Sequence, residues 1–497
     1  MSYAKALMFQ GTGSDVGKTV LVAGLCRAAK IRGIKVVPFK PQNMSNNAAI
    51  AQAGGLVGEI GRGQHLQAMA CGVVPSVHMN PILLKPQSQI GSQVIVQGKV
   101  YGNVKAREYQ SLKPQLLESV MQSFEEVAKE ADLVLVEGAG SPAEINLRAG
   151  DIANMGFACE AKVPVILIGD IDRGGVIASI VGTHTILPKG DRDLIAGYLI
   201  NKFRGDISLF DSGLKQIENF TGWQSFGILP WLDAVRKLPA EDSVTLNSVT
   251  LNSVALDKLT SSAKGKLKIA VPVLGKISNF DDLDPLKNEA DVELVFVKKG
   301  DALPIDAKLI VLAGSKSTID DLHEFRANGW DKQLHAHITK GGHVIGICGG
   351  YQMLGKSISD PHHIEGDVAS VEGLGLLDVE TVLETEKITR NASPKSVEFD
   401  VALEGYEIHS GRTHGPDCAN AMVVSETGKD GAIKGKVSGC YLHGLFNSDA
   451  YRAKLLQKFG IVANCESYKQ SVEDALDELA NHMETHLDVD GLLKLAK

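Results

Sequence analysis

The sequence lacks the features that would place the chain across a membrane, in an oxidising compartment or on nucleic acid. No apolar run is long enough to cross a bilayer as a helix. The seven cysteines are scattered and odd in number, and no two form a C-x-x-C pair, so neither a disulfide framework nor a zinc site is predicted. With 51 Lys and Arg against 59 Asp and Glu and no basic block, the chain offers no nucleic-acid surface.

A signal-peptide pattern is also missing, because Lys5 leads into a short apolar run and then a glycine-rich segment. Together with the cysteine usage, this predicts a cytoplasmic protein without a membrane span. At 497 residues the chain is too long for one hydrophobic core, so two or more globular domains are expected. The sequence leaves the oligomeric state open.

The glycine-rich segment, GTGSDVGKT at residues 11–19, carries the strongest chemical signal of the first half. An apolar run before it predicts a strand, and residues 20–30 predict a helix after it. Backbone N–H groups in such a turn, together with the helix N-terminus, bind phosphate. We expect Lys18 to reach the outer phosphates of ATP and the Thr19 hydroxyl to hold Mg²⁺.

The spacing departs from the common G-x-x-x-x-G-K-[ST] pattern, because Thr12 stands where the first glycine belongs and Gly11 precedes it. The strand and helix on either side nevertheless favour a P-loop over a glycine turn that happens to precede Lys-Thr. The predicted nucleotide-binding residues are Gly11, Thr12, Gly13, Ser14, Asp15, Val16, Gly17, Lys18, Thr19 and Asn201.

Polar residues follow the other apolar runs of the first half, which alternate with helical stretches and so predict a parallel sheet with helices on both faces. Ligands bind at the carboxyl ends of such strands. We expect Lys40 to neutralise charge during phosphoryl transfer, Glu137 to be the second anchor for Mg²⁺ with Asp15 as a further metal ligand, and Asn201 to contact the base. A surface lysine and a turn asparagine are the alternatives for Lys40 and Asn201.

The middle of the chain predicts a boundary. The unit Leu-Asn-Ser-Val starts at Leu246 and recurs at Leu251, and small polar residues follow it. Such a duplication is typical of a linker. We therefore expect an ATP-dependent synthetase domain at 1–240, a linker at 241–266, and a second domain at 267–497 that ends in a charged helical appendage.

The second half contains a candidate nucleophile. Cys348 lies in Gly346-Ile347-Cys348-Gly349-Gly350, between an apolar run and a helical stretch. This is the strand-to-helix elbow in which hydrolases present a nucleophile, and the helix N-terminus favours the thiolate. The N–H of Gly349 can stabilise an oxyanion, and the loop that starts at Gly314 can supply a second donor. The alternative is an inert buried cysteine.

A thiolate nucleophile needs a base, and His443, which follows an apolar run at 437–440, is the preferred candidate. Sequence alone ranks it only slightly above the other histidines of the second half. The competing residues are His343, His362, His363, His409 and His414.

Taken together, these motifs resemble two known modules. The first half is similar to dethiobiotin-synthetase-like ATP-dependent ligases, and the second to class I glutamine amidotransferases, so both domains are expected to be doubly wound α/β folds. More specific strings resemble the cobyric acid synthase family over almost the whole chain. These strings are FKPQNMSNN at 39–47, GEIGR at 58–62, GDIDRGG at 169–175 and INKFRGD at 200–206.

The resemblance implies an enzyme that uses ATP, Mg²⁺ and glutamine to amidate the b, d, e and g carboxylates of adenosylcobyrinic acid a,c-diamide. It implies Cys348 as the glutaminase nucleophile and His443 as its base, with acyl phosphates formed in the first domain. One departure is that Leu445 stands where the wider superfamily has a glutamate, two residues after the histidine. The third member of the triad is therefore unassigned, and a Cys-His dyad is an alternative.

Three other functions compete with this interpretation. Cobyrinic acid a,c-diamide synthases and cell-wall glutamine amidotransferases combine the same two modules, but the strings at 41–47 and 173–175 favour cobyric acid. A partner-binding ATPase switch would carry a signature lysine five residues before Lys18, where this chain has Gly13. A scaffold with an inactive glutaminase would release no glutamate from glutamine.

Overall fold

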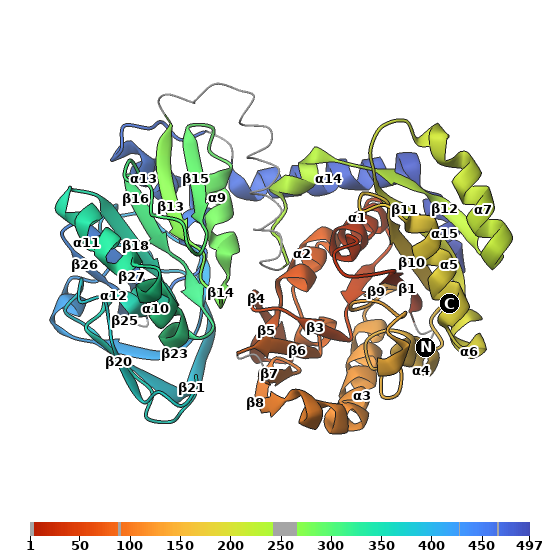
Figure 1. The fold of residues 1–497 in the computed structure, drawn as a ribbon, viewed down its shortest axis with the longest axis horizontal. Helices are drawn as coiled ribbons and strands as arrows, with labels where there is room; N and C mark the ends of the chain where they lie inside the picture. The colour runs from red at the N-terminus through yellow and green to blue at the C-terminus, as the bar shows by residue number, and fades with distance from the viewer. Residues whose placement is uncertain (1–3, 88–90, 242–265, 427, 465–466) are drawn as a thin grey trace. The chain divides into compact units, whose positions relative to one another are not determined.

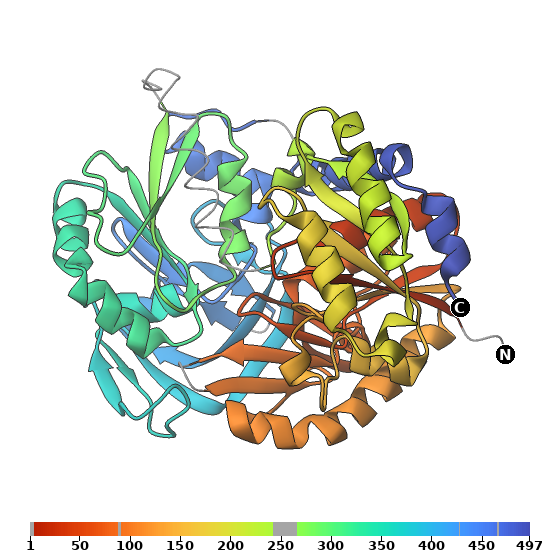
Figure 2. The same ribbon diagram turned by 45° about the vertical axis from the view of Figure 1, so that its right-hand side comes forward.

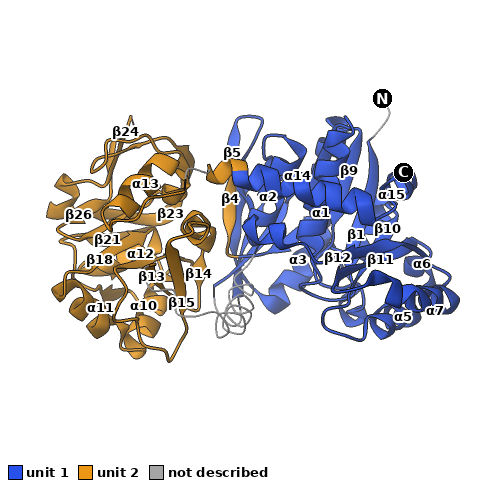
Figure 3. Cartoon of the chain, turned by 90° about the horizontal axis from the view of Figure 1, so that it is seen from above, with its two compact units in different colours: residues 1–45, 51–241, 471–497 blue, residues 46–50, 242–470 orange. Residues whose placement is uncertain are grey.

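The computed structural model describes residues 4–87, 91–241, 266–426, 428–464 and 467–497. The chain divides into two compact units, which Figure 3 colours separately. Unit 1 contains residues 1–45, 51–241 and 471–497, and unit 2 contains residues 46–50 and 242–470. Most of the predicted linker, residues 242–265, lies outside the described residues.

Unit 1 is built on a six-stranded sheet in the order β12-β11-β10-β1-β9-β2, in which every neighbouring pair is parallel. Its strands are β1 (Lys5–Gly11), β2 (Val36–Phe39), β9 (Leu133–Glu137), β10 (Val165–Asp170), β11 (Ile195–Phe203) and β12 (Gln224–Pro230). Successive residues Leu7, Met8 and Phe9 of β1 are all buried. Because successive side chains of a strand point to opposite faces, both faces of the sheet are covered, as a doubly wound fold requires.

Helices cover this sheet, and a smaller mixed sheet, β3-β6-β7-β8, lies in the same unit (Figures 1 and 2). The helices are α1 (Lys18–Ile31), α2 (Arg62–Cys71), α3 (Ala106–Lys129), α4 (Met155–Ala161), α5 (Val176–Ile186), α6 (Lys189–Arg192) and α7 (Asp211–Thr221). The other strands of this part of the chain are β3 (Gln42–Met44), β4 (Ala48–Ala53), β5 (Leu56–Gly61), β6 (Ile82–Pro86), β7 (Gly91–Val96) and β8 (Lys99–Lys105). The first half of β4 belongs to unit 2.

The last two helices, α14 (Tyr468–His486) and α15 (Val489–Leu495), return the chain to unit 1 from residue 471 onward. α14 packs on α1: a Cβ atom at Gly24 would come within 2.5 Å of Met483. Arg32 pairs with Glu484 and Asp490, and the backbone of Lys497 exchanges hydrogen bonds with Ala6 of β1. The sequence grouped these residues with the second domain as an appendage; the structure instead places them in unit 1.

Unit 2 is built on a second six-stranded sheet, in the order β15-β13-β16-β18-β27-β26. All neighbouring strands are parallel except the antiparallel edge pair β26–β27. Its strands are β13 (Leu267–Pro272), β15 (Val292–Val297), β16 (Leu309–Leu312), β18 (His343–Ile347), β26 (Ala432–Lys434) and β27 (Val437–Cys440). The expectation of two doubly wound α/β domains is confirmed.

Among the residues of unit 2 that the structure describes, the helices are short and three small sheets accompany the main one. The helices are α9 (Asp284–Lys287), α10 (Thr318–Ala327), α11 (Trp330–Thr339), α12 (Gly349–Leu354) and α13 (Asp449–Gln457). The additional strands are β14 (Ile277–Ser278), β17 (Gly314–Ser315), β19 (Ser357–Ser359), β20 (Ser370–Glu372), β21 (Glu380–Ala392), β22 (Lys395–Ser396), β23 (Gly405–His414), β24 (Val423–Ser425) and β25 (Gly428–Asp430). Among the described residues, no helix has both the length and the hydropathy to cross a membrane.

Candidate active sites

The first candidate site lies at the carboxyl end of β1, where the chain turns into α1. Gly17 precedes the helix with a φ of 92°, in the left-handed region that glycine adopts most readily. A Cβ atom at Gly11 would lie 2.5 Å from Val16, so the turn is close-packed at this position. The close approach that needs a glycine therefore occurs at Gly11, one residue before the place the common pattern gives it.

Four side chains converge beside this loop: Thr19, Lys40, Glu137 and Glu241. The Thr19 hydroxyl lies 2.8 Å from Oε1 of Glu137 and 2.5 Å from Oε2 of Glu241. Nζ of Lys40 donates to Oε1 of Glu137 at 2.8 Å and to Oε1 of Glu241 at 2.6 Å. The structure thus brings together three residues that the sequence singled out separately and adds Glu241, which the sequence assigned to the linker.

Two glutamines hold the other oxygen of Glu137, a side chain that is fully buried. Nε2 of Gln67 donates to Oε2 of Glu137 at 2.6 Å, and Nε2 of Gln64 lies 3.4 Å from the same atom. Both glutamines belong to α2. Because Oε2 is held in this way, Oε1 faces Thr19 and Lys40.

Lys18, Asp15 and Asn201 complete the loop. Nζ of Lys18 donates to the carbonyls of Gly13 and Gly140 at 3.1 and 3.0 Å. Asp15 pairs with Arg173 at 3.1 Å, a contact on the exposed side of the loop and separate from the Thr19 cluster. Asn201 donates from Nδ2 to the carbonyl of Val16 at 2.8 Å, which fixes the loop backbone just before Gly17.

The charges around Thr19 favour the protonated, positive form of Lys40 and the ionised form of Glu241. Burial alone would lower the pKa of Lys40, but the carboxylates of Glu137 and Glu241 raise it above its usual value. Burial would raise the pKa of Glu241, but Lys40 and the Thr19 hydroxyl outweigh it and lower that pKa. Lys18 lacks so close a carboxylate, and burial lowers its pKa.

The donor set fits Mg²⁺. Oxygen ligands from one hydroxyl and two carboxylates match the preference of this hard cation, which usually binds one or two carboxylates together with substrate phosphates and water. Among the described residues there is no cluster of three or more His, Cys, Asp and Glu side chains that could hold a metal alone. A cation at this site would therefore share its ligands with phosphate oxygens.

The second candidate site lies at the carboxyl end of β18. Cys348 joins β18 to α12 with a φ of 52°, so a non-glycine residue occupies the left-handed region. Glycines on either side allow the sharp turn: a Cβ atom at Gly350 would lie 2.0 Å from the carbonyl oxygen of Leu312, and one at Gly346 would lie 2.7 Å from the backbone of Gly350. This geometry is that of a nucleophile elbow.

His443 lies beside Cys348 and is oriented by Asp282. Nδ1 of His443 is 2.7 Å from Oδ2 of Asp282, and the N–H of Gly444 donates to the other oxygen of Asp282 at 2.7 Å. Tyr406 stacks on the imidazole with a centroid separation of 5.1 Å. Burial alone would lower the pKa of His443, but Asp282 and Cys348 raise it to about 10.

The glycines predicted to stabilise an oxyanion also adjoin this site. A Cβ atom at Gly349 would lie 2.8 Å from the backbone nitrogen of Ser315, so the start of α12 touches the loop that begins at Gly314. A Cβ atom at Gly314 would lie 3.3 Å from the imidazole of His443. Both glycines are therefore next to the groups that would handle the reacting carbonyl.

Comparisons with known proteins agree with this pair of sites. Residues 7–246 match the family described as "CobQ/CobB/MinD/ParA nucleotide binding domain", and residues 268–451 match "CobB/CobQ-like glutamine amidotransferase domain". A cobyric acid synthase of Mesorhizobium japonicum is 62% identical over 99% of this chain and all of its own length. One from Brucella suis is 61% identical, over 99% of this chain and all of its own length.

The chain belongs to the cobyric acid synthase family.

Two residues of the candidate sites in this member of the cobyric acid synthase family, Asp282 and Glu241, were not predicted as site residues from the sequence. Asp282 lies far from His443 along the chain, in the 3-10 helix Phe280–Leu283 that follows β14. Glu241 lies next to a stretch whose composition is that of a linker. The only sequence signal for Asp282 is its place after an apolar run, in Asn279-Phe280-Asp281-Asp282.

The competing histidines have other contacts. His343 begins β18, at the end opposite Cys348, and lies against Phe459 with ring centroids 5.1 Å apart. His409 stacks on Tyr441 at 3.7 Å, and its Nδ1 lies 2.8 Å from the carbonyl of Gly411. Carboxylates also approach two of these histidines, since Nε2 of His409 lies 3.6 Å from Glu407 and Nε2 of His362 lies 3.7 Å from Glu384. His443 combines a closer carboxylate, at 2.7 Å, with a pKa that Cys348 raises, and this combination favours it as the catalytic base.

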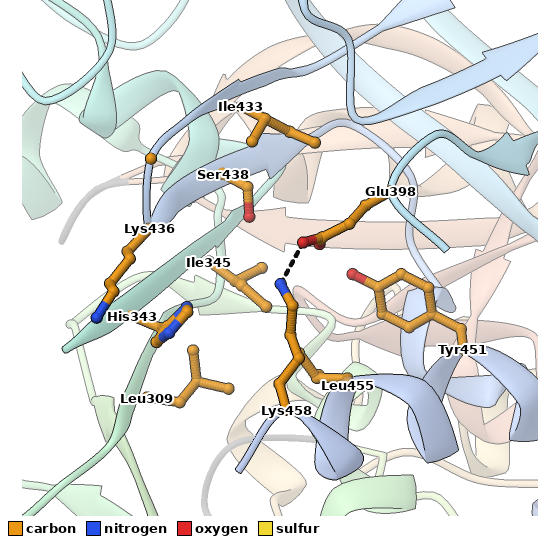
Figure 4. A pocket seen from close by; sticks show the side chains of 11 residues that line it. Leu309, His343, Ile345, Glu398, Ile433, Lys436, Ser438, Tyr451, Leu455 and Lys458 are labelled. Carbon is orange, nitrogen blue, oxygen red and sulfur yellow. Dashed lines mark hydrogen bonds and ion pairs between the residues drawn. The ribbon is translucent and has the colours of Figure 1, made fainter. Parts of the chain in front are cut away.

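A small pocket of unit 2 lies away from this chemistry (Figure 4). It is lined by His343 at the start of β18 and by the ion-paired side chains of Glu398 and Lys458. Since Cys348 follows the last residue of β18, the pocket and the elbow are at opposite ends of the strand. The pocket is therefore not part of the candidate glutaminase site.

Proposed function

We propose that this chain makes cobyric acid by amidating the b, d, e and g carboxylates of adenosylcobyrinic acid a,c-diamide, with ATP as the energy source and glutamine as the nitrogen donor. The observation that carries the proposal is 62% identity to a cobyric acid synthase along the whole length of both chains. The two candidate sites supply the two chemistries that such a reaction needs.

In the glutaminase site, the thiolate of Cys348 attacks the side-chain amide carbon of glutamine. His443 donates a proton to the departing ammonia, and a thioester remains. Water then attacks the thioester with His443 as the base, which releases glutamate and restores the thiolate. Asp282 holds the imidazole with Nε2 toward the sulfur and stabilises its charged form, the role of the third residue in a triad. Gly349 and Gly314 would donate N–H groups to the oxyanion.

In the synthetase site, a corrinoid carboxylate attacks the γ-phosphate of ATP and gives an acyl phosphate and ADP. Ammonia then displaces phosphate to form the amide. Lys18 and Lys40 neutralise charge on the transferring phosphoryl group, and residues 11–17 and Asn201 hold the rest of the nucleotide. Thr19 and Glu137 would hold Mg²⁺, which supplies further charge neutralisation when bound.

A direct assay tests the proposal. The purified protein is given adenosylcobyrinic acid a,c-diamide, ATP, Mg²⁺ and glutamine, and the added amide groups are counted by mass spectrometry. We expect four new amides per corrinoid. A corrinoid left unchanged while glutamine and ATP are consumed would reject the substrate, and consumption of neither would reject the reaction class.

A further inference from the structure

Glu241 contributes a second carboxylate to the cluster of Thr19, Lys40 and Glu137 in the synthetase site, although it lies in no recognised sequence motif. Its backbone carbonyl accepts a hydrogen bond from Oγ of Ser45 at 2.8 Å, which anchors the residue next to β3. Its carboxylate then reaches Thr19 with one oxygen and Lys40 with the other. The side chain is 22% exposed, whereas that of Glu137 is fully buried, so Glu241 forms the solvent side of the cluster.

The hydrogen count at Thr19 is unusual. Its hydroxyl has one proton, yet carboxylate oxygens of Glu137 and Glu241 lie 2.8 and 2.5 Å from its oxygen. One of the two contacts therefore brings a carboxylate oxygen against a hydroxyl oxygen with no proton between them. Such a contact becomes favourable when a cation binds both oxygens.

The spacing suits one cation. Ligands of Mg²⁺ lie about 2.1 Å from the ion in octahedral geometry, so neighbouring ligand oxygens are about 3 Å apart. The two contacts at Thr19 are close to this value. The ammonium group of Lys40 pairs with both carboxylates. Its positive charge offsets the repulsion between the two neighbouring negative side chains.

We propose that Glu241 is a third protein ligand of the Mg²⁺ that accompanies the nucleotide, with Thr19 and Glu137 as the other two. The inference rests on the proposed nucleotide site and deepens it. Glu241 is the last residue of the segment 51–241 of unit 1. Metal binding would thus tie the end of this segment to the nucleotide site.

The main competing role for Glu241 is an electrostatic gate, in which its carboxylate occupies the place of the γ-phosphate and must move away. The two roles predict opposite effects of Glu241→Gln. Loss of a ligand weakens metal binding in the nucleotide complex, whereas loss of a gate strengthens nucleotide binding even without metal.

The test uses the full chain and Mn²⁺ as a spectroscopic probe in place of Mg²⁺. Electron paramagnetic resonance titrations give the affinity for Mn²⁺ in the presence of a non-hydrolysable ATP analogue, and calorimetry in EDTA gives the affinity for the analogue alone. We expect Glu241→Gln to weaken Mn²⁺ binding about 10-fold or more and to leave the affinity in EDTA within about 2-fold. Glu160→Gln, an exposed change on α4, is the matched control and should alter neither value.

Unchanged Mn²⁺ affinity in Glu241→Gln would overturn the assignment of Glu241 as a metal ligand. Tighter binding of the ATP analogue in EDTA would also overturn it and would support the electrostatic gate. Circular dichroism melts check that the variant is folded, and Glu241→Asp, which keeps the carboxylate, should recover part of the Mn²⁺ affinity. A wild-type protein that binds no nucleotide at all would instead reject the proposed function, so the two failures are distinguishable.

Discussion

At the scale of single residues, the glutaminase site depends on an imidazole held between a carboxylate and a thiol. Asp282 and Cys348 raise the pKa of His443 from 6.5 to about 10, so the folded chain binds this proton more tightly than the unfolded chain. The resulting stabilisation is complete below pH 6.5, declines as the pH rises toward 10, and is absent above it.

We therefore predict a pH-dependent penalty for Asp282→Asn. The variant should lose most free energy of unfolding relative to wild type near pH 6 and progressively less as the pH approaches 10, measured by denaturant titration at several pH values. Its glutaminase kcat should fall about 10²-fold or more, because the imidazole loses its orientation and the stabilisation of its charge. A stability difference that does not vary with pH would contradict the role of Asp282.

Cys348→Ala separates the two chemistries. The variant lacks the nucleophile, so glutamine-dependent amidation should be abolished, while amidation with ammonium salts should continue because the synthetase site is untouched. Mass spectrometry of the corrinoid with each nitrogen source measures both rates. Loss of the ammonium-dependent reaction as well would show that Cys348 has a different role.

Gln67→Leu tests the support of Glu137. The change leaves Oε2 of a fully buried carboxylate without its 2.6 Å hydrogen bond, which should cost about 1–3 kcal/mol of stability and weaken Mn²⁺ binding in the nucleotide complex. Gln216→Leu, on the exposed face of α7, is the control and should leave metal binding unchanged. Equal metal affinity in both variants would show that Gln67 does not position Glu137.

At the scale of elements, the elbow between β18 and α12 has no room for a side chain at Gly350. Gly350→Ala would push a Cβ atom to 2.0 Å from the carbonyl oxygen of Leu312. We expect a loss of about 3 kcal/mol or more in stability and no measurable glutaminase activity. Gly182→Ala, in open space on α5, should leave activity unchanged and raise stability slightly, because alanine is the better helix former. Thermal melts and glutamate release compare the two.

The secondary-structure elements that the sequence predicted best are the strands that are buried on both faces of a sheet. Runs such as 133–136 are continuously apolar, so their composition and length identify them, together with the polar residue that follows. The strands β3 to β8 were missed because glycine, polar or charged residues interrupt their apolar pattern, and β12 was missed because Gly227 and Pro230 interrupt its pattern. Asp282 could not be assigned because its partner, His443, is its neighbour only in the folded chain.

At the scale of the whole molecule, α14 and α15 complete unit 1 although they follow unit 2 in the sequence. Val472, Leu476, Leu479 and Met483 of α14 are buried. We predict that removing residues 471–497 lowers the melting temperature of unit 1 by about 10 °C or more, because the loss of several buried side chains costs more than about 5 kcal/mol.

Calorimetry with and without an ATP analogue measures this effect, since the analogue should shift only the transition of the unit that binds it. Glu484→Gln, which removes one exposed partner of Arg32, is the control and should change the melting temperature by no more than about 2 °C. A truncated chain that melts like the full chain would contradict the packing of α14 on α1.

The return of the chain to β1 and α1 has a practical consequence for protein engineers. Two polypeptides made by dividing the gene within residues 242–265 would not be independent proteins, because the second would carry α14 and α15, the covering that the first lacks. Such halves should copurify when coexpressed, held by contacts such as those of Met483 with Gly24. A clean dissection of the two activities would instead require a circular permutant in which residues 471–497 precede residue 4.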